Sequence, residues 1–163
     1  MVDRHLHLET DASVNPARSR GGVREARTYL AGAGIVLRSE SMRPVAVESV
    51  PLGYVESALH AEGLALRHGL RRARSLGATS VRARSDCAAL VSVLEGSGRF
   101  EDPGLAALVD ELREEIAGLT EFRIVWSSSF HGRSRGDGVP APDHLAREAA
   151  GLGRRTVGRR RRG

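Results

Sequence analysis

The chain has 163 residues, of which 40% are hydrophobic, and this suffices for one buried core, so we expect a single domain with tails. No apolar run approaches the roughly 18 residues of a membrane span, which excludes a membrane protein and leads us to expect a soluble, cytoplasmic monomer. The formal net charge of +5, with 25 arginines and no lysine, favours polyanionic partners, and the lone Cys87 excludes an intramolecular disulfide.

The N-terminal third of the chain predicts three strands. Residues 5–11 alternate between two faces and end at Asp11, which is typical of a strand. Residues 12–28 contain Asn-Pro and Gly-Gly pairs and four arginines, so they predict an irregular basic loop. Residues 29–38 and 44–50 are rich in apolar side chains and predict a hairpin that extends the first strand antiparallel.

A long helix is predicted over residues 54–76, where apolar residues recur every three or four positions and Gly77 follows. Glu62 falls inside the apolar stripe, three residues after Leu59 and four before Leu66. Burying a lone ionised carboxylate is costly unless a cation or strong donors compensate it, and a metal ion would do so. The alternative places Glu62 at the edge of the stripe with its carboxylate in water.

The rest of the chain predicts strands that alternate with helices. The predicted elements are a strand at 79–85, helices at 86–94 and 103–118, a strand at 122–126, a basic loop at 127–139 and a last helix at 141–152. The strand–helix–strand order around residues 54–85 predicts a parallel pairing. Asp86 stands at a strand-to-helix junction and Asp143 at the start of the last helix, and each acid taken alone is more simply explained as a helix N-cap or first-turn acid.

Four short motifs come in the order found in one known superfamily. They are TDAS at 10–13, HAEGLAL at 60–66, RSDCAALV at 84–91 and PDHLAREA at 142–149. Together they resemble the ribonuclease H superfamily, and type 1 ribonuclease H in particular. The resemblance implies an α/β fold with a mixed five-stranded sheet flanked by helices, in which the first three strands are antiparallel and the fourth and fifth run parallel to the first. Residues 1–152 would form this domain, and 153–163 a basic disordered tail.

The same resemblance implies an activity and the residues that carry it. A type 1 ribonuclease H cuts the RNA strand of an RNA–DNA hybrid with two Mg²⁺ or Mn²⁺ ions. The metal-binding carboxylates of the family fall on Asp11, Glu62, Asp86 and Asp143. His131 lies where relatives carry a catalytic histidine, although the interval from His131 to Asp143 is slightly long, and a solvated loop histidine is the alternative. Contacts to the 2′-hydroxyl are expected from the following residues: Ala12, Ser13 and Asn15.

Two other functions remain open from the sequence. The first is a non-catalytic nucleic-acid-binding module on the same fold, because the basic helix and loop that some bacterial members use to hold substrate are missing between Asp86 and Phe122. Grip on a hybrid would then rest on the arginine-rich loops and tail. The second is an exonuclease or an integrase-like strand transferase, but the early Asp-x-Glu of such enzymes is absent, because Asp11 is followed by Ala12 and Ser13.

Overall fold

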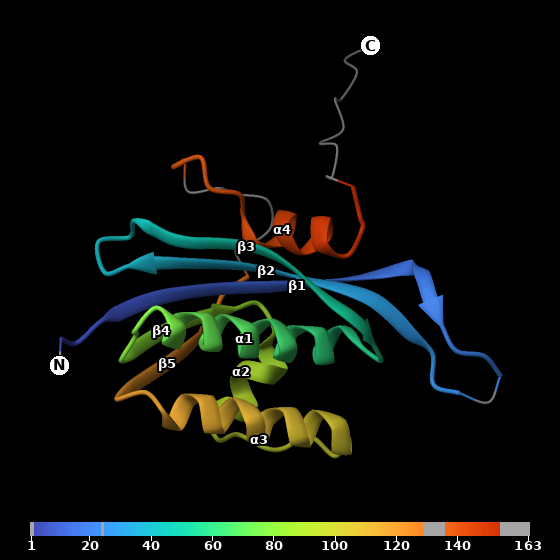
Figure 1. The fold of residues 1–163 in the computed structure, drawn as a ribbon. Coiled ribbons are helices and arrows are strands. Elements are labelled where there is room, and N and C mark those ends of the chain that lie inside the picture. The colour runs from blue at the N-terminus through green and yellow to red at the C-terminus, as the bar shows by residue number, and fades with distance from the viewer. Residues whose placement is uncertain (1, 24, 129–135, 154–163) are drawn as a thin grey trace, which may run out of the picture.

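A computed structural model describes residues 2–23, 25–128 and 136–153, and the chain forms one five-stranded sheet between two layers of helices (Figure 1). The elements in chain order are β1 (His5–Arg20), β2 (Thr28–Ser39), β3 (Pro44–Val55), α1 (Ala58–Ser75), β4 (Ser80–Ser85), α2 (Ala88–Leu94), α3 (Pro103–Ala117), β5 (Glu121–Trp126) and α4 (Pro142–Ala149). None of the helices in the described part of the chain has the length and apolar character needed to cross a membrane.

The strand order in the sheet is β3-β2-β1-β4-β5. β2 pairs antiparallel with both β1 and β3, whereas β4 pairs parallel with β1 and with β5. This topology confirms the predicted fold class. Because β1, β4 and β5 run in the same direction, the carboxyl ends of β4 and β5 lie together at one edge of the sheet, beside the middle of β1, which itself continues to Arg20.

The main core lies between the sheet and α1, α2 and α3. β1 contributes Leu6 and Leu8, whose side chains pack in one cluster with Leu66 and Leu70 of α1. The helices α2 and α3 close the same cluster at its far side (Figure 1). The predicted amphipathic stripe of α1 is therefore the surface that this helix buries against the sheet.

The opposite face of the sheet is covered by α4, which packs closely on β2. Two glycines of β2 make this approach possible. A Cβ at Gly32 would lie 2.4 Å from the backbone nitrogen of Ala150, and a Cβ at Gly34 would lie 1.9 Å from the carbonyl oxygen of Pro142. Since such distances are far below van der Waals contact, α4 can sit here only over residues without side chains.

Some predicted boundaries are wrong, and each error has a local cause. Residues 12–28 are not an irregular loop, because β1 continues to Arg20 and pairs with β2 across a register shift between Asn15 and Ser19. The helix predicted over 54–76 begins only at Ala58, since Tyr54 still pairs with β2 and the Ser57 hydroxyl accepts a hydrogen bond from His60 N–H as N-cap. The helix predicted from residue 86 begins at Ala88.

Candidate metal centre

Asp11 lies in the middle of β1, opposite Gly34 of β2, and only 5% of its surface is exposed to solvent. The backbone N–H of Ala12 donates hydrogen bonds to Asp11 Oδ1 at 2.9 Å and to Glu62 Oε1 at 3.2 Å. One amide group thus holds two carboxylates side by side. The strand and the helix that carry them pack against each other in the main core, so this juxtaposition is a property of the fold.

Glu62 reaches the same place from the first turns of α1. Its second carboxylate oxygen, Oε2, is buried and has no hydrogen-bond partner among the described residues. A buried carboxylate oxygen without a donor costs considerable free energy when the group is charged. The stripe-edge alternative for Glu62 is therefore wrong, because the carboxylate is turned toward Asp11 and not into water.

Asp86 completes the group from the carboxyl end of β4. The residue lies between β4 and the N-cap of α2, which is Cys87, so Asp86 is not the helix cap that its position in the sequence suggested. The indole N–H of Trp126, at the end of β5, donates a hydrogen bond to the Asp86 carbonyl oxygen at 3.0 Å. This bond ties the backbone of Asp86 to the neighbouring parallel strand.

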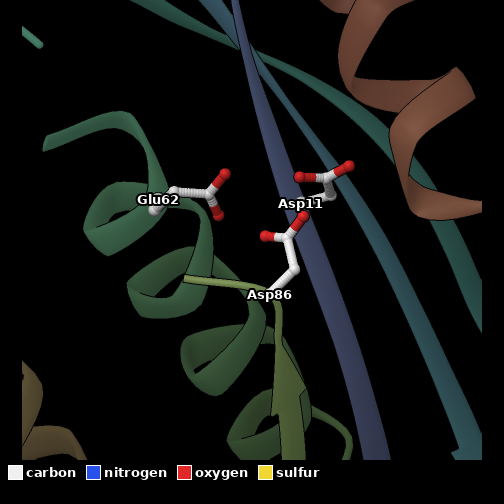
Figure 2. A group of neighbouring side chains, drawn as sticks. All are labelled: Asp11, Glu62 and Asp86. Carbon is white, nitrogen blue, oxygen red and sulfur yellow. The ribbon is translucent and has the colours of Figure 1, made fainter. Parts of the chain in front are cut away.

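These three carboxylates converge (Figure 2). Asp11, Glu62 and Asp86 each offer one oxygen, and the three oxygens all lie within 4.8 Å of one another. The cluster joins a strand interior, a helix and a strand end that are 51 and 24 residues apart in the sequence. Carboxylate oxygens at this spacing are the donor set that hard divalent cations prefer.

The electrostatics of the cluster also favour the binding of a cation. Burial raises the pKa of Asp11 to about 7, and the charges of Asp86 and Asp143 add to the rise. Burial likewise raises the pKa of Glu62 to about 9, with further contributions from Asp11 and Asp86. Without a cation, Glu62 therefore stays largely protonated at neutral pH and Asp11 is protonated in part, and a divalent ion would displace these protons. The residues present fit such an ion.

Asp143 lies in the first turn of α4, which covers the face of the sheet opposite to α1. It is not part of the group of three whose oxygens lie within 4.8 Å, but its charge contributes to the raised pKa of Asp11. Close packing over Gly34 brings Asp143 near Asp11. The carbonyl of Pro142, next to Asp143, packs directly on Gly34, and Gly34 pairs with Asp11. Of the four predicted carboxylates, three are thus brought together and the fourth is placed beside them.

The other predicted site residues have different surroundings. Asn15 is 4% exposed, and its side-chain amide donates to the Ala150 carbonyl at 2.9 Å while its oxygen accepts from the Ala17 N–H. Its side-chain nitrogen thus joins β1 to the end of α4, and a contact of Asn15 with substrate stays a prediction. Ser13 is partly exposed two residues beyond Asp11. His131 lies outside the described residues.

The sequence did not predict a network of polar side chains that lies next to the three carboxylates. Glu9 is 5% exposed and pairs with Arg84 at 3.4 Å, and Arg84 also donates to the Ser127 hydroxyl at 2.7 Å. Glu9 and Arg84 are register partners, each two residues before Asp11 or Asp86 on its strand. In the sequence, Glu9 precedes Asp11 by two residues and Arg84 precedes Asp86 by two. This equal spacing indicates an ion pair only once the parallel register of β1 and β4 is known.

Comparison with known proteins gives a family and a set of related structures. The family model described as reverse transcriptase-like matches residues 18–129, which include Glu62 and Asp86 but neither Asp11 nor Asp143. RNase H1 from the halophilic archaeon Halobacterium salinarum is 25% identical, with 89% of this chain and 96% of that chain covered and a TM-score of 0.69. No curated protein matches the chain.

Two further structures share the fold at lower identity. The N-terminal RNase H domain of a Mycobacterium tuberculosis protein, solved as a fusion with maltose-binding protein, is 23% identical, with 90% and 98% of the two chains covered and a TM-score of 0.70. LC11-RNase H1, solved in complex with an RNA/DNA hybrid, is 18% identical, with 90% and 96% covered and a TM-score of 0.71.

Proposed function

Because the chain belongs to the reverse transcriptase-like family of the ribonuclease H superfamily, we propose that it is a metal-dependent endonuclease that hydrolyses the RNA strand of RNA–DNA hybrids. The observation that carries this proposal is the convergence of Asp11, Glu62 and Asp86 within 4.8 Å. The hybrid seen with LC11-RNase H1, whose fold this chain shares, supports the choice of substrate.

In this proposal Asp11, Glu62 and Asp86, with Asp143 beside them, would hold two Mg²⁺ or Mn²⁺ ions. When bound, such ions supply activation of the attacking water and stabilisation of the charge on the leaving oxygen. The protein's own part is to orient the oxygens. The Ala12 N–H donates hydrogen bonds to one oxygen of Asp11 and one of Glu62. The buried Oε2 of Glu62 has no hydrogen-bond partner among the described residues and could coordinate a cation.

The supporting residues restrict movement of the ligands. Trp126 fixes the Asp86 backbone, and the pair of Glu9 and Arg84 joins β1 to β4 one layer below the carboxylates. We further propose Ser13 and the Ala12 backbone as contacts to the 2′-hydroxyl of the RNA strand, since they follow Asp11 directly. His131 is proposed to assist turnover, on the family resemblance of its position alone.

The test is a cleavage assay with purified protein and labelled RNA–DNA hybrid, RNA duplex and DNA duplex, each in Mg²⁺ and in Mn²⁺. We expect cleavage of the RNA strand of the hybrid only. Asp86→Asn should lose more than about 100-fold of this activity, because even residues behind metal ligands are worth 10- to 100-fold. Asp110→Asn on the exposed face of α3 is the matched control and should cut normally.

Metal binding provides a second measurement that does not depend on turnover. Calorimetric titration with Mn²⁺ should show binding to the wild-type chain and to Asp110→Asn, and much weaker binding to Asp86→Asn. A protein that binds hybrid in a salt-sensitive manner but cuts none of the three substrates with either metal would be the non-catalytic module instead.

A further inference from the structure

The segment between β1 and β2 is a projecting strand pair. We call residues 16–23 and 25–28 the β1–β2 arm. Its two strands stay paired to the end, with Ser19 opposite Tyr29 and Arg20 opposite Thr28. Figure 1 shows the arm extending beyond the end of the sheet, on the side where α1 begins. At its turn Gly21 has a φ of +101°, a conformation that side chains disfavour, and the Glu25 N–H donates to the Gly22 carbonyl at 3.2 Å.

The described residues of the arm are basic and exposed. Arg18, Arg20 and Arg27 all face solvent, and Glu25 is the one acid among them. None of the three arginines forms an ion pair with any residue that the structure describes. The arginines of α1 differ, because all four of them pair with acids of β3 or α3. The positive charge of the arm is thus left available to a partner.

One arm arginine is held in place without being neutralised. The guanidinium carbon of Arg20 lies 4.0 Å from the centre of the Tyr54 ring on β3. Stacking of this kind covers one face of the guanidinium and leaves its edge N–H groups free to donate. Arginine binds phosphate oxygens through two parallel hydrogen bonds from the N–H groups at the edge of its guanidinium. The ring therefore orients Arg20 for an anion while fixing the arm to the sheet.

The distance between the arm and the carboxylates suits a duplex. Arg18 and Arg20 follow Asp11 by seven and nine residues on the same strand. At about 3.4 Å per residue, less the shortening at the register shift, they lie on the order of 25 Å away. One helical turn of a duplex is on the order of 30 Å long, and an RNA–DNA hybrid is closer to A-form than to B-form. A duplex whose cleaved bond lies at Asp11, Glu62 and Asp86 and which runs along β1 meets the arm before completing one turn.

We propose that the β1–β2 arm grips the phosphate backbone of the RNA–DNA hybrid, with Arg18, Arg20 and Arg27 as its contacts. The position of the duplex in this inference rests on the proposed function, whereas the exposure and charge of the arm do not. The arm would thereby take the part of the extra basic helix and loop that are missing between Asp86 and Phe122.

The test compares two triple variants with equal loss of charge. One replaces Arg18, Arg20 and Arg27 by Ala; the control replaces Arg43, Arg82 and Arg123, which are exposed on the β2–β3 turn, β4 and β5. Fluorescence anisotropy in EDTA measures the affinity for labelled hybrids of about 8 and about 20 base pairs over a range of salt. On the long hybrid, the slope of log affinity against log salt should be shallower by about 2 to 3 for the arm variant, because each lost phosphate contact removes about 0.9.

Further outcomes decide the proposal in either direction. The arm variant should match the wild type on the short hybrid, and a version with Lys at the three positions should regain most of the slope. An arm variant with the wild-type slope on the long hybrid, and the wild-type thermal unfolding midpoint, would overturn the inference. Cleavage of the short hybrid in Mg²⁺ separates the two claims, since loss of arm-dependent affinity without any cleavage rejects the proposed function alone.

Discussion

At the scale of single residues, the shared amide of Ala12 shows how the fold tolerates adjacent carboxylates. Its N–H binds Asp11 and Glu62 together, although their negative charges repel each other when both are ionised. The raised pKa values of the two acids result first from the loss of water around them and then from repulsion by neighbouring carboxylates. The native chain therefore holds more protons than the unfolded chain between the ordinary carboxyl range and about pH 9.

This proton difference predicts how stability depends on pH. In EDTA, the free energy of unfolding should fall as pH rises from about 4 to about 9, because the folded state must give up protons that the unfolded state has already lost. Mg²⁺ should reduce the fall, since it binds the deprotonated cluster. Thermal unfolding followed by circular dichroism between pH 5 and 9 measures both effects.

Removing one of the charges gives a sharper version of the same experiment. Glu62→Gln in EDTA should be more stable than the wild type at pH 9 and should lose the stabilisation by Mg²⁺. Glu114→Gln, at an exposed position of α3, is the control. If Glu62→Gln is no more stable than the wild type at pH 9, the carboxylate is not electrostatically strained in the native protein.

Trp126 is the only tryptophan of the chain, which makes it an internal probe. Its N–H bonds the Asp86 carbonyl, so Mn²⁺ at the carboxylates should quench its emission, and the quenching should disappear in Asp86→Asn. Trp126→Phe should weaken Mn²⁺ binding roughly 2- to 10-fold, the value of one hydrogen bond. Calorimetry on this variant checks the second effect. Equal Mn²⁺ affinity in wild type and Trp126→Phe would show that the indole does not position Asp86.

At the scale of secondary structure, the fit of α4 against β2 connects stability to the site. Gly34→Ala would force the new Cβ against the Pro142 carbonyl and shift the turn that carries Asp143. We expect a loss of about 1–3 kcal/mol in the free energy of unfolding and a marked loss of cleavage. Gly22→Ala, where no atom lies within 4 Å, should change neither; denaturant unfolding and the hybrid assay compare the two.

Helices and strands could be predicted where a local sequence pattern determines them. They could not be predicted where they depend on pairing with a distant strand. The apolar stripe placed Glu62 correctly because a helix repeats every 3.6 residues whatever it packs against. The Asn-Pro and Gly-Gly pairs predict a loop over residues 12–28, yet the first part of this segment pairs with β2. Pro16, which has no N–H to donate, falls within the register shift and so interrupts the pairing only locally.

At the scale of the whole molecule, the order of the four acids could be predicted and their spacing could not. The sequence places Asp11, Glu62, Asp86 and Asp143 on separate elements, and only the parallel pairing of β1 and β4 brings the first three together. The position of Asp143 depends on the close packing of α4 over Gly32 and Gly34 of β2, a tertiary contact that no local pattern in the sequence indicates. The Glu9–Arg84 pair depends on the same register.

The proposed boundary between domain and tail can be tested by truncation. A chain ending at Gly153 retains all of the described core and should keep the thermal unfolding midpoint of the full chain. It loses six arginines, so its affinity for hybrid should fall in low salt and approach that of the full chain in high salt. A lowered midpoint would mean that residues 154–163 belong to the folded domain.

The two layers of helices impose an order on the assembly of the proposed site. Glu62 arrives with α1 on one face of the sheet, while Asp143 arrives with α4 on the other, and α4 follows every other described element in the chain. A polypeptide emerging from the ribosome can therefore build its sheet and first three helices before the candidate metal centre has acquired Asp143. Detachment of α4 alone would in the same way take Asp143 away from the other three acids without unfolding the main core.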